Sequence, residues 1–223
     1  MKTFLLFAML SILLFSCGNP ATQAVKVTSS KIDTGAVPKT IKYKGSIDTA
    51  VKYTDSEGQH IIVTSEDDDL EKSDDGDPRL TGIYLYAYCY KLTGDKWELL
   101  WQMRDFINEC DLDIAGEFIP NTFAITDLDQ NGKAEVWLMY SLACRGGVDP
   151  ADLKVIMHEG VKKYAMRGGS KVKVNATDYA GGDYKFDAAF KSAPLVFRQH
   201  AQSLWEKHKN ENFGEDHPNG NIN

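Results

Sequence analysis

A short polar segment, residues 123–137, places oxygen-bearing side chains at alternate positions of the chain. Asp127, Asp129 and Asn131 are followed by a glycine, and Glu135 completes the segment. Alternate spacing lets a tightly curled loop direct successive side chains to one point, and the glycine permits the sharp reversal. Calcium is a hard cation that takes about six to eight oxygen ligands. We therefore expect a structural calcium site formed by Asp127, Asp129, Asn131, the carbonyl of Lys133 and Glu135, completed by water.

This segment departs from the EF-hand pattern. An EF-hand needs a glutamate at position twelve of its loop, where this chain has Leu138, and the flanking residues alternate like strands. The alternative to a metal site is a hairpin whose Asn131-Gly132 turn is flanked by solvated aspartates. We favour calcium because three carboxylates on one short loop repel one another without a cation.

The spacing Asp-x-Asp-x-Asn-Gly-x-x-Glu over residues 127–135 resembles the calcium loops of FG-GAP and integrin-type β-propeller repeats. Those repeats occur in tandem, whereas this chain contains one copy. The resemblance therefore implies a calcium loop and does not imply a propeller.

Two other groups of residues suggest catalysis, and each has a simpler explanation. Carboxylates between residues 105 and 117 allow a glycosidase-like acid pair, but solvated surface acids are common. Cys144 lies in an Ala-Cys-Arg-Gly segment that resembles a caspase nucleophile, yet Leu142 occupies the glutamine position and the upstream histidine is distant. We find no nucleophile elbow, zincin helix, phosphate loop or dinucleotide fingerprint, so the sequence favours a protein that is not an enzyme. The acidic group comprises Asp105, Glu109, Asp111, Asp113 and Glu117.

Residues 1–16 have the pattern of a secretory signal. Lys2 supplies a positive charge, residues 4–15 form an apolar run, and a small residue precedes Cys17. The run is shorter than the roughly 20 residues of a membrane-spanning helix. The placement of Cys17 resembles the lipobox of bacterial lipoproteins. This resemblance implies that the chain is cleaved before Cys17 and that Cys17 is acylated, with chains such as palmitate. The acyl chains would anchor the domain at the outer membrane. An ordinary secreted protein is the alternative.

Charge and composition limit the partners and the domain plan. The net charge is −7 with no basic run, so the chain has no electrostatic footprint for nucleic acid. Residues 18–39 are poor in large apolar side chains, as in a flexible tether, and residues 210–223 are similar. We expect a signal at 1–16, a lipidated tether at 17–39, one β-rich domain at 40–209 and a disordered tail at 210–223.

Three cysteines remain once Cys17 is assigned to lipid. Cys89 alternates in phase with Ile83, Leu85 and Ala87, so we expect it to be a buried core residue. An exported protein meets an oxidising environment. We therefore expect a disulfide between Cys110 and Cys144, with three free thiols as the alternative.

From residue 40 onward, short alternating runs separated by turn residues fill the chain, as is typical of antiparallel hairpins. We expect about nine strands, and we expect the acidic stretch 66–78 to be a solvated loop. The expected strands pair 50–54 with 60–65, 82–92 with 97–106, 122–126 with 134–142, and 154–158 with 161–167, with a further strand at 171–175.

The end of the chain has a different period. Phe197, Ala201 and Trp205 recur at helical spacing behind Ser192, the expected cap, and Pro194. The predicted fold class is therefore α+β, with a β-dominant antiparallel meander and a C-terminal helix packed on the sheet.

Aromatic side chains gather on one expected hairpin. The tyrosines of residues 84–90 share one face of their strand, opposite the face of Cys89. Aromatic faces stack on sugar rings, and they also serve as ordinary covers of sheets. The candidate glycan-binding residues are Tyr84, Tyr86, Tyr88, Tyr90, Trp97 and Trp101.

The lipobox, the tyrosine-rich strand, the 127–135 loop and residues 153–168 together resemble a family of uncharacterised Gram-negative envelope lipoproteins, some of them named surface polysaccharide biosynthesis proteins. The likeness covers residues 80–168 and includes no catalytic motif. It implies a cell-envelope role connected with surface glycans, with a polysaccharide or an envelope protein as partner. We expect a lipid-anchored binding or accessory protein. The alternatives are a glycan-active hydrolase using the 105–117 carboxylates and a lipoprotein inhibitor of an external hydrolase.

Overall fold

The computed structural model describes residues 25–72 and 78–211. The expected signal at 1–16, the expected lipid site at Cys17 and nearly all of the expected tail lie outside the described residues.

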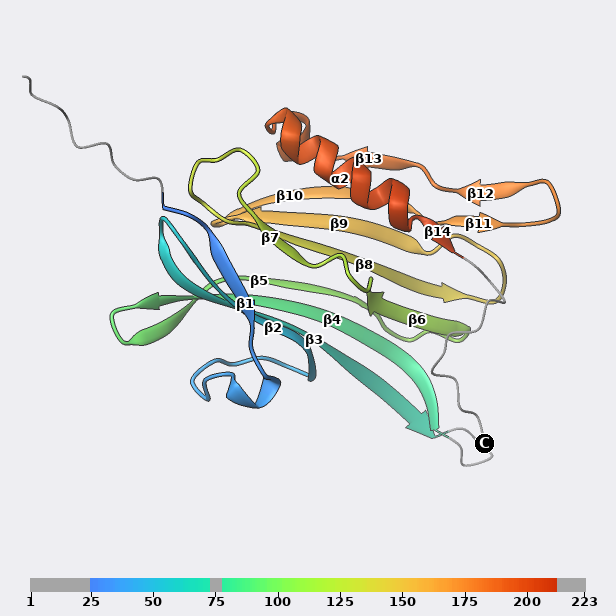
Figure 1. Cartoon of the computed structure of the whole chain (residues 1–223). Helices are drawn as coiled ribbons and strands as arrows, with labels where there is room; N and C mark the ends of the chain where they lie inside the picture. The colour runs from blue at the N-terminus through green and yellow to red at the C-terminus, as the bar shows by residue number, and fades with distance from the viewer. Residues whose placement is uncertain (1–24, 73–77, 212–223) are drawn as a thin grey trace, which may run out of the picture.

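Sheet A is a meander of five antiparallel strands in the order of the sequence, and each neighbouring pair is joined by hydrogen bonds (Figure 1). A β-bulge interrupts the pairing of its second and third strands between Ile47 and Thr49. The strands are β1 (Thr28–Lys31), β2 (Ser46–Asp55), β3 (Gly58–Lys72), β4 (Pro78–Thr93) and β5 (Lys96–Ile107).

Sheet B follows in the chain and has the order β13-β10-β9-β8-β6, with β7 also pairing β8. A small third sheet, in the order β12-β11-β14, lies beyond it. The strands of sheet B are β6 (Asp113–Phe118), β7 (Ala124–Thr126), β8 (Glu135–Arg145), β9 (Asp152–Glu159), β10 (Lys162–Gly169) and β13 (Tyr184–Phe186). Those of the small sheet are β11 (Lys171–Lys173), β12 (Tyr179–Gly181) and β14 (Asn210–Glu211).

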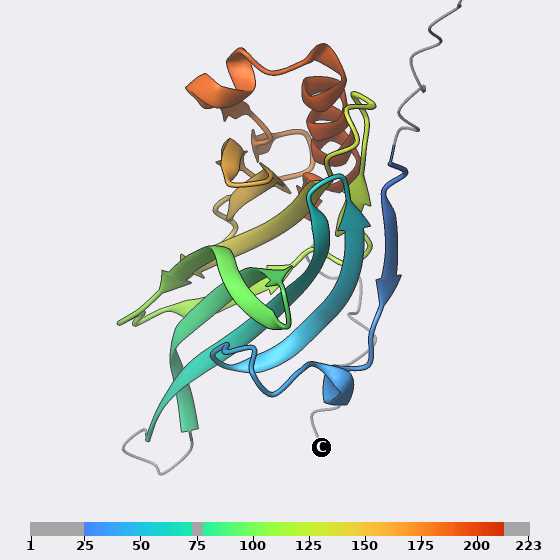
Figure 2. The ribbon, with the colours of Figure 1, turned by 90° about the vertical axis from the view of Figure 1, so that its left-hand side faces the viewer.

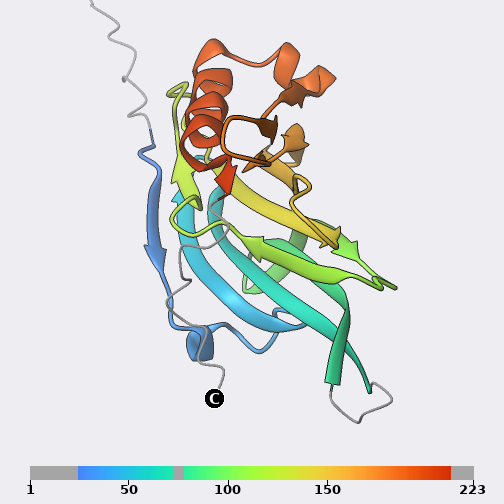
Figure 3. The ribbon, with the colours of Figure 1, turned by 90° about the vertical axis from the view of Figure 1, so that its right-hand side faces the viewer.

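The elements form layers, which Figures 2 and 3 show from the two sides. Sheets A and B face each other across the main apolar core, and the helices α1 (Ala188–Lys191) and α2 (Leu195–His208) cover the other face of sheet B. The chain between β1 and β2, with the 3-10 helix η1 (Thr34–Ala36), packs on the outer face of sheet A. Both sheets are therefore covered on both faces over part of their area.

This two-sided covering explains why β4 and β8 are apolar along nearly their whole length. In β4, Leu85 and Cys89 are fully buried against sheet B, while Tyr88 is buried on the opposite face. In β8, Leu138 faces sheet A, and Trp137 packs under the helices. Each fully buried side chain of this size stabilises the fold by about 1.5–3 kcal/mol.

The C-terminal helix lies where its spacing predicts. Phe197, Ala201 and Trp205 are the buried residues of α2, and they pack on sheet B. The expected cap is wrong: Pro194 precedes the helix without a side-chain cap, because Ser192 ends the short helix α1 instead. None of the helices in the described residues is long and apolar enough to cross a membrane.

The α+β class, dominated by antiparallel strands, is confirmed, but the described residues contain fourteen strands where about nine were expected. The acidic stretch expected as a loop continues β3 as far as Lys72, because the opposing strand β4 supplies a hydrogen-bonded partner for residues 66–72. The expected tether contains β1, because Thr28–Lys31 pairs with the exposed edge of β2.

Candidate metal centre

The polar loop of residues 127–134 connects β7 to β8. These two strands are antiparallel partners, and Thr126 lies opposite Glu135 at the start of the loop. The pairing brings the two ends of the loop together, so a carboxylate at its end meets carboxylates from its beginning. Gly132 has a φ of 79°, a backbone conformation that glycine adopts without the steric cost of a Cβ atom.

Three of the five expected ligand residues converge. One carboxylate oxygen from each of Asp127, Asp129 and Glu135 lies within 4.8 Å of the other two. No other group of three or more His, Cys, Asp or Glu side chains within residues 25–72 and 78–211 comes this close. The arrangement suits a metal ion, because a cation offsets the mutual repulsion of the carboxylates.

Glu135 is the buried member of the group, with a side chain that has no solvent exposure. Both of its oxygens accept a hydrogen bond from the Leu128 amide at 2.9 Å, and Oε2 also accepts one from the Thr126 hydroxyl at 2.6 Å. Burial raises the pKa of Glu135, and the nearby charge of Asp129 adds to that rise against the opposing effect of the hydrogen bonds. A bound cation would favour the ionised form of this carboxyl.

Asn131 braces the loop. Its Nδ2 donates to Glu159 at 2.6 Å and to Asp129 at 3.1 Å, and its Oδ1 accepts from the Lys133 amide at 2.8 Å. The side-chain oxygen of this expected ligand is therefore engaged with the backbone of the turn. The structure brings together the three acidic members of the predicted set, and Asn131 lies beside them, hydrogen-bonded to Asp129 and Glu159.

The turn between β2 and β3 clamps this loop, a contact that the sequence analysis missed. Asp55, which is buried, accepts a hydrogen bond from the Ala134 amide at 3.0 Å, and the Ser56 amide donates to the Gly132 carbonyl at 2.8 Å. Lys133 forms an ion pair with Glu57 at 2.7 Å, which lowers the pKa of Glu57. The loop of sheet B is thereby fixed to a turn of sheet A.

The expected disulfide is present. Cys110 and Cys144 are bonded, with their Cα atoms 5.9 Å apart. Cys144 therefore carries no free thiol, which removes the caspase-like interpretation. Cys89 is free and buried, as expected, and burial raises its pKa to about 12 with Tyr53 as hydrogen-bond partner at 3.6 Å.

The aromatic residues expected to bind glycan do not form one open surface. Tyr86, Tyr88 and Tyr90 are 5–7 % exposed beneath the segment that joins β1 to β2. The Tyr90 hydroxyl donates to the Lys42 carbonyl at 2.6 Å, so the covering segment is hydrogen-bonded to the ring that it covers.

The remaining aromatic candidates are divided between the two faces of sheet A. Trp101 lies on the inner face, where its ring stacks on His158 at 3.9 Å. Trp97 packs at the edge of the covered tyrosines. Tyr84 stacks on Phe106, which is 41 % exposed, at 5.6 Å. Tyr84 therefore forms a partly exposed aromatic pair with Phe106, a residue outside the predicted set, and the Arg104 guanidinium lies over both rings.

The carboxylates of residues 105–117 are dispersed. Asp105 accepts hydrogen bonds from Tyr140 at 2.8 Å and from Lys154 at 2.6 Å, and its pKa is lowered by these partners in spite of its burial. Asp111 has a side chain that is 97 % exposed beside Arg79. Asp113 and Glu117 lie on β6, and Glu109 lies in the connection that precedes it. No hydrogen bond within the described part of the chain joins two members of this group.

Comparisons with protein-family models, with curated proteins and with solved structures each found no match.

Proposed function

We propose that this chain is a lipid-anchored binding or accessory protein of a bacterial cell envelope, with a β domain that one calcium ion stabilises. Three features support the proposal: the signal and cysteine pattern of residues 1–17, the Cys110–Cys144 disulfide and the acidic loop. Disulfides persist in oxidising compartments, and such compartments also hold the millimolar calcium that a modest loop site requires. The proposed partner is an envelope polysaccharide or a protein that assembles it.

The observation that carries the calcium proposal is the convergence of Asp127, Asp129 and the buried Glu135 within 4.8 Å. All the available side-chain ligands are oxygens, which favours calcium or magnesium over zinc or copper. Calcium accepts flexible geometry and high coordination numbers, whereas magnesium demands a near-ideal octahedron and retains its waters. An irregular loop with three carboxylates and backbone carbonyls nearby therefore favours calcium.

Calcium in this position would have a structural role. The loop is hydrogen-bonded to the β2–β3 turn through Asp55 and Gly132, so an ion that orders the loop also orders a contact between the two sheets. Asp105, the most enclosed of the other acidic candidates, is already held by Tyr140 and Lys154. These contacts favour a binding role over hydrolysis.

Thermal unfolding with calcium and with chelator tests the metal assignment. An ion at about 100 times its dissociation constant stabilises a protein by about 2.7 kcal/mol, which raises the Tm of a chain of this size by about 5–10 °C. Asp129→Asn should abolish the rise, whereas Asp111→Asn, at an exposed carboxylate remote from the loop, should retain it. An equal Tm in calcium and in chelator would exclude the site.

The anchor and the partner need separate tests. Metabolic labelling with palmitate should acylate the wild-type protein and should fail for Cys17→Ser. Polysaccharide purified from the envelope of the producing bacterium should sediment with the protein in calcium. Release of sugar from that polysaccharide by the wild-type protein would favour the hydrolase alternative.

A further inference from the structure

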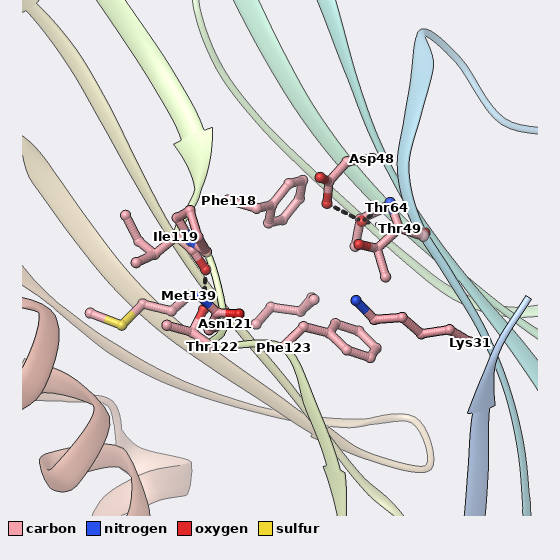
Figure 4. Close-up of a pocket in the computed structure, with 12 residues that line it drawn as sticks. Lys31, Asp48, Thr49, Thr64, Phe118, Ile119, Asn121, Thr122, Phe123 and Met139 are labelled. Carbon is pink, nitrogen blue, oxygen red and sulfur yellow. Dashed lines mark hydrogen bonds between the residues drawn. The ribbon is translucent and has the colours of Figure 1, made fainter. Parts of the chain in front are cut away.

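A cavity of about 350 Å³ opens between the two sheets on the side of β1 (Figure 4). Its volume is in the range of small-molecule sites, roughly 300–1,000 Å³. Sheet A supplies one wall through β1, β2 and β3, and the other wall comes from the end of β6, the β6–β7 connection and β8.

The wall from sheet A is polar and carries both signs of charge. Lys31 extends from β1 with its ammonium group directed into the cavity, and Asp48 lies on the neighbouring strand β2 of the same wall (Figure 4). Asp48 Oδ2 accepts a hydrogen bond from the buried Thr64 hydroxyl at 2.9 Å, which fixes the carboxylate and leaves Oδ1 for another donor. Within the described residues, neither Lys31 nor Asp48 belongs to an ion pair.

The β-bulge in β2 explains how Asp48 reaches this wall. Ile47 pairs with Ser65 and Thr49 pairs with Thr64, so Asp48 is the extra residue that has no partner on β3. In a regular strand, Asp48 and Thr49 would point to opposite faces. A bulge redirects a side chain in this way and is over-represented beside functional sites. The backbone bulge therefore places the Asp48 carboxylate in the cavity.

The facing wall is mostly apolar and carries two phenylalanine rings, with Asn121 and Thr122 as its polar members. Phe118 and Phe123 present their rings to the cavity (Figure 4), and Leu138 also lines it. The Phe118 ring makes an edge contact with Tyr140 at 5.9 Å, which fixes its orientation. The Thr122 hydroxyl donates to the Ile119 carbonyl at 2.6 Å, so the connection between β6 and β7 is held in place. The aromatic wall is therefore preorganised.

We propose that this cavity binds the ring of an acidic sugar, a pyranose that carries a carboxylate. The C–H face of such a ring packs on Phe118 and Phe123, because aromatic faces attract weakly positive hydrogens. A ring hydroxyl donates to Asp48 Oδ1, and Lys31 donates to the sugar carboxylate. The proposal rests on the proposed binding role of the domain and names a ligand class for it.

Calorimetric titration of the calcium-loaded protein with glucuronate, glucose and hexanoate tests this assignment. Glucuronate should bind more tightly than either of the other two compounds, since only glucuronate offers both hydroxyls and a carboxylate. Lys31→Gln should weaken glucuronate binding by on the order of tenfold and leave glucose binding unchanged, the effect of one lost charge-assisted contact. Lys173→Gln, at an exposed lysine on β11, is the matched control and should bind as the wild type does.

Asp48→Asn should weaken binding of glucuronate and glucose together, because both offer hydroxyls to this carboxylate. Three results would overturn the assignment: no glucuronate binding by the wild type, hexanoate binding as tight as that of glucuronate, or unchanged glucuronate affinity in Lys31→Gln. Lys31 is exposed, so its variant keeps the test decisive even if Asp48→Asn unfolds. If the cavity does not bind glucuronate, the rise of Tm with calcium should remain. If the loop does not bind calcium, the rise of Tm should be absent and glucuronate binding should remain.

Discussion

Substitution of Asp55 tests how strongly the β2–β3 turn stabilises the loop of residues 127–134. Its carboxylate is 7 % exposed and accepts hydrogen bonds from the amides of Glu57, at 2.8 Å, and Ala134, at 3.0 Å. Asn in this position retains one acceptor oxygen and turns an NH₂ group toward one of these amides. Asp55→Asn should therefore leave one amide unsatisfied in a buried place.

The expected cost follows from the two contacts. A hydrogen bond to a charged group contributes about 1.5–3 kcal/mol, and a buried donor left without a partner costs a similar amount. We expect Asp55→Asn to lower the free energy of unfolding by about 2–3 kcal/mol and to weaken calcium binding, since the loop loses its clamp to sheet A. Urea denaturation, with and without calcium, measures both effects.

The matched control is Asp95→Asn in the turn between β4 and β5. Asp95 is an exposed aspartate of a β-hairpin turn, so its loss should change stability by less than about 0.5 kcal/mol. If Asp55→Asn matched Asp95→Asn in stability and kept wild-type calcium affinity, the contact between Asp55 and the loop would have no energetic role.

Three further variants concern the disulfide, a covered tyrosine and a buried histidine. Cys110→Ser should lower the free energy of unfolding by about 3–4 kcal/mol, because the unfolded chain gains conformational entropy without the cross-link. Reduction of the wild-type Cys110–Cys144 disulfide should give the same urea midpoint. A much smaller loss of stability would contradict this entropic explanation. Tyr90→Phe should lower the free energy of unfolding by about 1 kcal/mol, because it removes the hydroxyl that is hydrogen-bonded to the Lys42 backbone. Unchanged stability would mean that packing alone holds the covering segment. Burial and the nearby Lys163 lower the pKa of His158 to about 4. Because the unfolded chain takes up the proton more readily, the free energy of unfolding should fall by up to about 3 kcal/mol as the pH falls from about 6.5 toward 4. His158→Phe should reduce this loss of stability, and an unchanged loss would assign it to other groups.

The sequence predicted features that depend on local pattern. Alternation in residues 83–90 correctly divided the strand into two faces, and helical spacing correctly placed α2. The Cys110–Cys144 pair followed from the prediction that the chain is exported and from the expected burial of Cys89. The convergence of the three carboxylates followed from their alternate spacing in one loop.

Features that depend on long-range pairing escaped the sequence analysis. Asp55 and Ala134 are 79 residues apart, and their contact arises only when the two sheets face each other. The residues that cover the tyrosines come from a segment with the composition of a linker. Asp48 reaches its cavity through a bulge, and the register of β2 against β3 decides where that bulge falls. Strand register and sheet packing are tertiary properties that local composition does not encode.

Equilibrium dialysis with radioactive calcium tests most directly whether one calcium ion binds at the 127–135 loop. We expect one ion per wild-type chain and none for Glu135→Gln, whose buried side chain keeps its size and loses its charge. Wild-type protein that binds no calcium at millimolar concentration, or a Glu135→Gln variant that binds it as the wild type does, would exclude a calcium site at this loop.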